Sequence, residues 1–191
     1  MTPFDKAKEL LVKTLQLPSR SDKSLTPDDV REAREYIANY WAKVERYHPK
    51  DDESLLGLPK PYLVPSYRLK TGFDYNELYY WDSYFMAQAL LDKDHQELVM
   101  GILEDLMSLF KRFKVIPNAS RTYSTGRSQP PFLTSFILDV YQAYDLDKKW
   151  LKTAIRVAEQ EYKTVWMGVK KPNELQVYRG LSRHYDINYL H

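Results

Sequence analysis

Apolar residues recur every three or four positions along most of the 191-residue chain, and this spacing is typical of amphipathic α-helices. The pattern is strongest in the stretch that carries Val99, Ile102, Leu106 and Phe113. No segment alternates convincingly between apolar and polar residues, as a half-buried strand would. We therefore predict an all-α fold of about six helices, over residues 4–15, 27–47, 79–91, 99–113, 132–144 and 150–165.

The clearest helix start is the tetrapeptide Thr26-Pro27-Asp28-Asp29. Threonine is a good N-cap residue, and proline is tolerated in the first turn because its missing N–H has no helical partner there. Two acidic residues then meet the positive end of the helix dipole. This tetrapeptide predicts that one of the helices begins at Pro27.

Two long loops interrupt the helical pattern. Residues 48–78 begin with a segment that contains four prolines, and residues 114–131 are polar and end in two prolines. Loops longer than about a dozen residues in a compact helical protein tend to be functional. Because these loops alternate with the short turn near residues 92–94, we expect a stack of helical hairpins with both long loops on one face. That face is the predicted active surface.

Composition narrows the classes of function. Lys and Arg number 28 and Asp and Glu 26, and this net charge of +2 gives no case for a nucleic acid or an acidic membrane as partner. The absence of cysteine excludes disulfide frameworks, thiolate zinc sites and cysteine nucleophiles. Aromatic residues stand out, with 16 Tyr, 4 Trp and 7 Phe, and such rings either fill a core or stack on flat ligands such as sugars.

No targeting or membrane segment is visible in the sequence. Charges at Asp5, Lys6, Lys8 and Glu9 interrupt the place where a signal peptide needs an apolar run. The longest apolar stretches fall far short of the roughly 20 residues that span a bilayer. We expect a soluble, cytoplasmic chain.

Two segments hold polar groups that a hydrophobic core does not explain. In residues 77–85, Trp81 stands beside Asp82 at a helix start, and this pair suits a sugar ring and its hydroxyls. The alternative is that Asp82 only stabilises the helix N-terminus and that Trp81 belongs to the core. In residues 118–129, two arginines, amides and a hydroxyl form a dense set of donors. The alternative there is a solvated loop whose arginines pair with acids on neighbouring helices.

The remaining polar motifs favour structural roles. Residues 161–167 have the spacing of core residues, and a single histidine beside an arginine in residues 183–186 is usually structural. The four histidines are far apart and lack carboxylates at ligand spacing, so no metal site is predicted. No phosphate-binding glycine loop and no GxSxG nucleophile motif occurs.

Five segments, in order along the chain, resemble signatures of the trehalase family of glycoside hydrolases. Residues 78–85 (LYYWDSYF) resemble one of its signatures, and residues 116–131 (IPNASRTYSTGRSQPP) are similar to its IPNGxRxYYxxRSQPP segment. Residues 54–65 (SLLGLPKPYLVP) match the loop that approaches the family's active site. Residues 161–167 and 180–186 match its EYxFWM and LxRYxD stretches.

This resemblance implies a fold, a substrate and a binding site. The fold would be part of an (α/α)6 toroid with its pocket at one mouth. Trp81 and Asp82 would line the glucose subsites, Asn118 and Arg127 would bind sugar hydroxyls, and Gln129 would lie nearby. The substrate would be trehalose or a related α-linked disaccharide, hydrolysed without a cofactor or a metal.

The chain also departs from the family pattern. The family carries an arginine that touches the sugar shortly before its YYWD motif, and Asp74 stands at the aligned position here. The loop is longer, and Arg68 is the candidate replacement for that arginine. The glycine of the family's PNG is Ala119, and its second tyrosine is Ser124. Which disaccharide binds stays open because of these changes.

Residues 1–191 are expected to be the N-terminal part of a trehalase-like (α/α)6 catalytic domain. An inverting glycosidase needs two carboxyl groups about 6.5–9.5 Å apart, and the family motifs that carry them would begin after His191. We therefore expect no catalytic residue in this chain, no activity of the chain alone, and a second chain as the candidate partner that completes the toroid. The alternative is a non-catalytic helical sugar-binding or interaction module, since an open half-toroid exposes apolar faces that drive association.

Overall fold

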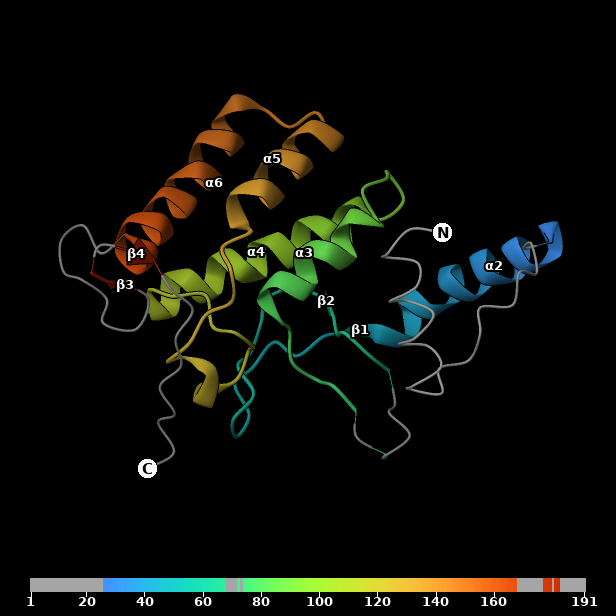
Figure 1. The fold of residues 1–191 in the computed structure, drawn as a ribbon, viewed down its shortest axis with the longest axis horizontal. Coiled ribbons are helices and arrows are strands. Elements are labelled where there is room, and N and C mark those ends of the chain that lie inside the picture. Colours follow the sequence, from blue (N-terminus) through green and yellow to red (C-terminus); the bar gives the residue numbers. More distant parts are fainter. Residues whose placement is uncertain (1–25, 68–71, 73, 168–176, 180, 183–191) are drawn as a thin grey trace, which may run out of the picture. The chain divides into compact units, whose positions relative to one another are not determined.

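The computed structural model describes residues 26–67, 72, 74–167, 177–179 and 181–182, which are mostly helical (Figure 1). Five α-helices lie in this part of the chain: α2 (Pro27–Val44), α3 (Tyr80–Gln88), α4 (Gln96–Phe113), α5 (Leu133–Ala143) and α6 (Lys148–Glu161). The all-α prediction is confirmed, and the helix predicted over residues 4–15 lies outside the described residues. None of the five described helices is both long and apolar enough to cross a membrane.

The chain divides between Asn39 and Tyr40 into two compact units. The first unit holds most of α2, which starts where the sequence predicts. The Thr26 hydroxyl accepts a hydrogen bond from the backbone N–H of Asp29 at 3.2 Å, and the Asp29 carboxylate accepts one from the backbone N–H of Thr26 at 2.8 Å. This reciprocal pair is a capping box that uses aspartate in place of glutamate. The hydrogen bonds from Thr26 lower the pKa of Asp29.

The core of the second unit is built around α4, which contacts α3, α5, α6 and the strand β2 (Tyr62–Leu63). Leu103, Leu106 and Leu109 of α4 are fully buried, as is Phe136 of α5. Each fully buried side chain of this size contributes about 1.5–3 kcal/mol of hydrophobic free energy. The apolar stripe read from the sequence is therefore the face on which the helices pack.

The described residues also contain two short strand pairs that the apolar pattern does not predict. β1 (Glu45–Arg46) pairs with β2 in antiparallel register, Glu45 opposite Leu63 and Arg46 opposite Tyr62. A second antiparallel pair joins β3 (Val177–Tyr178) to β4 (Leu181–Ser182). Strands of two residues are too short to show an alternating pattern, and β1 pairs with residues far along the chain, so local sequence carries no signal for them.

The two long loops lie side by side, as predicted. In Figure 1 most of the described part of each loop lies below α3 and α4, the end of residues 114–131 runs up past α4 to α5, and α5 and α6 lie above. The backbone N–H of Leu56 donates to the carbonyl of Ser120 at 2.9 Å, and that of Thr122 donates to the carbonyl of Ser54 at 2.8 Å. Because these bonds join residues 48–78 to residues 114–131, the loops form one connected surface.

Candidate functional site

The candidate site begins with a short antiparallel alignment of residues 78–80 with residues 118–120. Ser120 makes two bonds to Leu78: its N–H donates to the Leu78 carbonyl at 2.8 Å, and its hydroxyl accepts from the Leu78 N–H at 2.9 Å. One step along, the Tyr80 N–H donates to the Asn118 carbonyl at 3.3 Å. These bonds bring the start of α3, which carries Trp81 and Asp82, next to the loop that carries the predicted sugar-binding donors.

The side chain of Gln129 joins the two segments at the predicted site residues themselves. Its Oε1 accepts from the backbone N–H of Trp81 at 2.8 Å, and its Nε2 donates to Oδ2 of Asp82 at 3.3 Å. The first N–H groups of a helix have no partner inside the helix, so Gln129 also caps the N-terminus of α3. The carboxylate of Asp82 is thereby held in one orientation by a neutral amide.

Asn118 and Arg127 are joined through their backbones. The Asn118 N–H donates to the Arg127 carbonyl at 2.9 Å, and the Arg127 N–H donates to the Ser124 carbonyl at 3.2 Å, which closes the loop into a turn. Both side chains are half-buried. The structure therefore brings Trp81, Asp82, Asn118, Arg127 and Gln129 into one hydrogen-bonded neighbourhood; their contact with a sugar stays a prediction.

Trp81 is not a core residue, so the interpretation that its ring belongs to the hydrophobic core is wrong. Its side chain is 39% exposed and packs edge-on against Phe85, with ring centroids 5.9 Å apart. It also contacts Phe132 in a tilted arrangement at 6.4 Å. An indole that presents open surface beside a carboxylate and an amide offers both an apolar face for stacking and polar groups for hydrogen bonds.

Arg121 pairs with an acid, as the alternative interpretation expected, but this acid, Glu77, lies in the other long loop and not on a neighbouring helix. Its Nη2 lies 2.9 Å from Oε2 of Glu77, and its Nη1 donates to the Ser54 hydroxyl at 3.0 Å. Tyr79 donates its hydroxyl to the other oxygen of Glu77 at 2.9 Å. Burial opposes the charge on Glu77, but the hydrogen bonds from Arg121 and Tyr79 outweigh it and hold the pKa below its usual value.

The packing role predicted for residues 161–167 is confirmed for Glu161, Val165 and Trp166, which are buried. They lie at the end of α6 and in the π-helical turn η2 (Tyr162–Trp166). One feature is absent from the sequence prediction: both oxygens of Glu161 accept from the Tyr80 hydroxyl, at 3.0 and 3.1 Å. A tyrosine and a glutamate 81 positions apart give no local signal of such a bond.

The remaining candidate residues from the sequence are either exposed or outside the described residues. Asp74 is exposed. Arg68 and residues 183–186 lie outside the described residues. Within the part that is described, no group of three or more His, Asp or Glu side chains is arranged to hold a metal ion.

Residues 8–189 match the sequence model of the family described as trehalase. The chain belongs to the trehalase family. The family model covers most of the chain and includes both segments that form the candidate site.

Several curated trehalases are similar to the chain. A probable trehalase of Eremothecium gossypii is 37% identical over 149 residues, which cover 75% of this chain and 19% of that protein. The cytosolic neutral trehalase of Saccharomyces cerevisiae is 37% identical over 75% of this chain and 18% of its own length. The periplasmic trehalase of Citrobacter koseri is 33% identical over 79% of this chain and 25% of its own length. The chain thus spans about a fifth to a quarter of these relatives.

A solved trehalase has the same fold over the matched region. The neutral trehalase Nth1 from Saccharomyces cerevisiae superposes with a TM-score of 0.55 and 30% sequence identity. The match covers 93% of this chain and 32% of that protein. The helices described above therefore correspond to part of an α/α toroid, as the resemblance implied.

Proposed function

We propose that this chain forms the N-terminal part of a trehalase-like (α/α)6 domain and supplies part of its sugar-binding face. Trp81 and Asp82 line a glucose subsite, and Asn118, Arg127 and Gln129 donate hydrogen bonds to sugar hydroxyls. The ligand is trehalose or a related α-linked disaccharide. Family membership supports the ligand class, and the hydrogen bonds that join the two segments carrying these five residues support the site.

The observation that carries this proposal is the Gln129 amide held between Trp81 and Asp82. A sugar hydroxyl is both a donor and an acceptor, so it is matched by a carboxylate and an amide set side by side. The half-exposed indole of Trp81 adds an apolar surface for the C–H face of the ring. No other described segment combines these three groups.

We further propose that the catalytic acid and base are not among the residues described here. Glu77 is buried and held in an ion pair with Arg121, so it is not available to protonate a leaving group. Glu161 is buried beneath Tyr80, and Asp82 is held by Gln129 as a binding group. Glycoside hydrolysis requires one carboxyl that donates a proton and another that activates water.

The test of the binding role is a calorimetric titration of the 191-residue chain with trehalose. Asp82→Asn is expected to weaken binding about tenfold, since hydrogen bonds to a charged group contribute about 1.5–3 kcal/mol. Asp139→Asn is the matched control, because Asp139 lies on α5, where Oδ2 accepts from Tyr84 at 3.1 Å. Equal affinities of the two variants would overturn the assignment of Asp82.

The test of the catalytic role is glucose release from trehalose. The chain alone is expected to release none above the buffer blank, because general acid–base catalysis contributes about 10²–10⁴-fold per group. Activity that appears only after a second chain with the missing carboxyl groups is added would support a completed toroid. Robust turnover by the chain alone that Asp82→Asn abolishes would show that Asp82 is catalytic.

The second candidate function is a non-catalytic interaction module. It is favoured by the exposed aromatic surface next to the candidate site, where Phe85 is 53% exposed and contacts Phe132 at a centroid distance of 5.1 Å. Exposed apolar patches of this kind drive association. Phe85→Ser is expected to reduce self-association in analytical ultracentrifugation, whereas Asp82→Asn is expected to weaken trehalose binding and to leave self-association unchanged.

A further inference from the structure

The carboxyl of Glu161 is the most deeply enclosed acid at the junction of α3, α5 and α6. It ends α6 with 2% of its surface exposed, and its oxygens accept from the Tyr80 hydroxyl. Burying a carboxyl is costly unless hydrogen bonds compensate it. Packing alone does not explain a buried acid at this place, because an apolar side chain would fill the same space at a lower cost in free energy.

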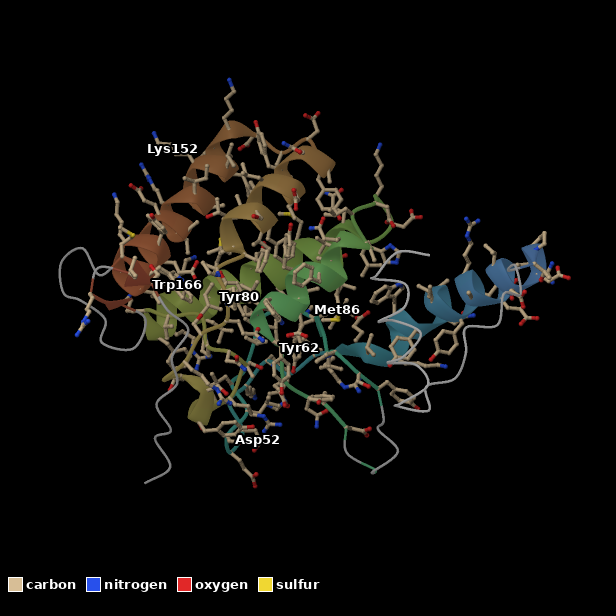
Figure 2. The ribbon with its side chains drawn as sticks, viewed as in Figure 1. Asp52, Tyr62, Tyr80, Met86, Lys152 and Trp166 are labelled. Atoms are coloured by element: carbon tan, nitrogen blue, oxygen red, sulfur yellow. The ribbon has the colours of Figure 1, made fainter. Side chains whose placement is uncertain are left out.

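Tyr80 links this acid to three other segments. Its hydroxyl also accepts from the Leu133 N–H, at 3.0 Å, and so satisfies a free donor in the first turn of α5. Its backbone N–H donates to Asn118 in the candidate site. Figure 2 labels Tyr80 and Trp166 at this junction, between α3 and the end of α6. One side chain thus ties together the loop, α3, α5 and α6.

The residues that follow Tyr80 are Trp81 and Asp82, both of which are bonded to Gln129. Gln129 in turn lies four positions before Leu133, the residue that Tyr80 bonds on α5. Any rotation of Tyr80 about the start of α3 therefore moves both sides of the candidate site. The junction has the geometry of a support for the Trp81–Asp82–Gln129 arrangement.

We propose that Glu161 is a positioning residue, which acts through the Tyr80 hydroxyl to hold Trp81 and Asp82 in register with Gln129. The expected effect of Glu161 on sugar binding rests on the proposed function. The hydrogen bonds that run through Tyr80 do not depend on it. Glu161 touches no predicted ligand group itself. Its effect on a sugar is transmitted by the first turn of α3.

The protonation state of Glu161 offers a readout that mere packing would not give. Burial raises the pKa of this carboxyl to about 7, although the hydrogen bonds from the Tyr80 hydroxyl favour its charged form. Among the described residues, the groups that face it are Tyr80 of α3 and Trp166 of η2. Burial raises the pKa of Tyr80 far above neutrality, and Trp166 does not titrate, nor does the Leu133 amide that is bonded to the Tyr80 hydroxyl. A transition near neutral pH in this network therefore reports Glu161.

The experiment is an NMR pH titration of the full ¹⁵N-labelled chain. The Trp81 backbone amide and the Gln129 side-chain amide are expected to shift together with a midpoint near 7. Glu161→Gln is expected to remove that transition and to keep both signals near their wild-type positions, because its amide oxygen still accepts from Tyr80. Absence of the transition in the wild type, or its persistence in Glu161→Gln, would overturn the proposal.

Two further variants separate positioning from packing. Glu161→Leu removes the acceptor and is expected to speed hydrogen exchange of the Trp81 amide about tenfold. Tyr84→Phe is the matched control, since it removes another hydroxyl of α3, the one bonded to Asp139, and is expected to change neither signal. Unchanged Trp81 exchange in a folded Glu161→Leu would contradict the proposal. Should that variant not fold, the Glu161→Gln titration decides.

A trehalose titration of the same sample tests the proposed function independently. Shifts of the Trp81 and Gln129 signals on adding trehalose, weaker in Glu161→Leu than in the wild type, would support both. A pH transition that depends on Glu161 without any response to trehalose would refute the sugar site. In that case the positioning of Trp81 by Glu161 would stand.

Discussion

Arg121 and Glu77 lie 44 positions apart in sequence and form an ion pair that is nearly closed to solvent, with Nη2 and Oε2 2.9 Å apart. The guanidinium also reaches the Ser54 hydroxyl, so the pair holds the two long loops and the approach to α3 together. Neither residue belongs to the set predicted to contact sugar. Their role is to give that set a fixed frame.

Arg121→Met is expected to destabilise the chain by about 3 kcal/mol, because it leaves the Glu77 carboxylate buried without its partner. Urea unfolding followed by circular dichroism measures this change. Arg31→Met is the control: Arg31 pairs with Asp28 at 2.7 Å, but both side chains are mostly exposed, so its loss should cost less than about 1 kcal/mol. Equal losses in the two variants would show that the Arg121 pair does not support the fold.

Asp105 is expected to make stability depend on pH. It is fully buried on α4, where Oδ1 accepts from the Lys60 N–H at 3.0 Å, and burial raises its pKa to about 8. Between about pH 4 and pH 8 the folded chain therefore binds more protons than the unfolded chain. Stability should fall as pH rises through this window, by up to about 1.4 kcal/mol per pH unit from this group.

Asp105→Asn tests this expectation, because asparagine accepts the same bond from Lys60 without titrating. At about pH 8 the variant should be more stable than the wild type, and its stability should depend less steeply on pH. Glu161, whose pKa is raised to about 7, adds a slope of the same sign that this variant keeps. Asp145→Asn, at an exposed position with φ 48° that asparagine also adopts, should leave the slope unchanged. An unchanged slope in Asp105→Asn would refute the prediction.

Arg127→Lys is expected to weaken sugar binding more than the retained charge suggests, by about tenfold, because the planar fork of the guanidinium is lost. The measurement is the trehalose affinity of this chain and of a complete trehalase-like protein that contains it. Arg156→Lys, at an exposed position of α6, is the matched control and should bind as the wild type does. Wild-type affinity in Arg127→Lys would remove Arg127 from the proposed site.

Gly57→Ala is expected to destabilise the chain by about 2 kcal/mol, since overpacking of a tight site typically costs 1–3 kcal/mol. A Cβ atom there would lie 2.5 Å from the backbone carbon of Lys50, which cannot move aside cheaply. Gly101→Ala is the contrast, because its Cβ would meet the Lys60 side chain at 3.0 Å and alanine favours the helix by about 1 kcal/mol. Thermal unfolding should separate the two, and equal effects would contradict the argument.

Much of the fold follows from local sequence. The apolar stripe of α4 and the Thr26–Asp29 capping box act within one helix, so residues near one another in sequence determine them. Sequence motifs and the family resemblance predict the residues of the candidate site, and the tertiary structure shows that Gln129 bonds to both Trp81 and Asp82. Local sequence does not predict which arginine of the loop forms an ion pair, because the partner of Arg121 is a buried acid in a distant segment.

The sequence by itself determined that this chain is helical, that its prolines and polar runs form two long loops, and that it resembles the trehalases. These properties depend on neighbours within a few positions or on patterns of residue types. Only the tertiary structure decided that Gln129 caps α3 and that Tyr80 joins Glu161 to α5. Those bonds link groups 48 to 81 positions apart, and whether they form depends on how packing of the helices around α4 brings distant segments within hydrogen-bonding distance.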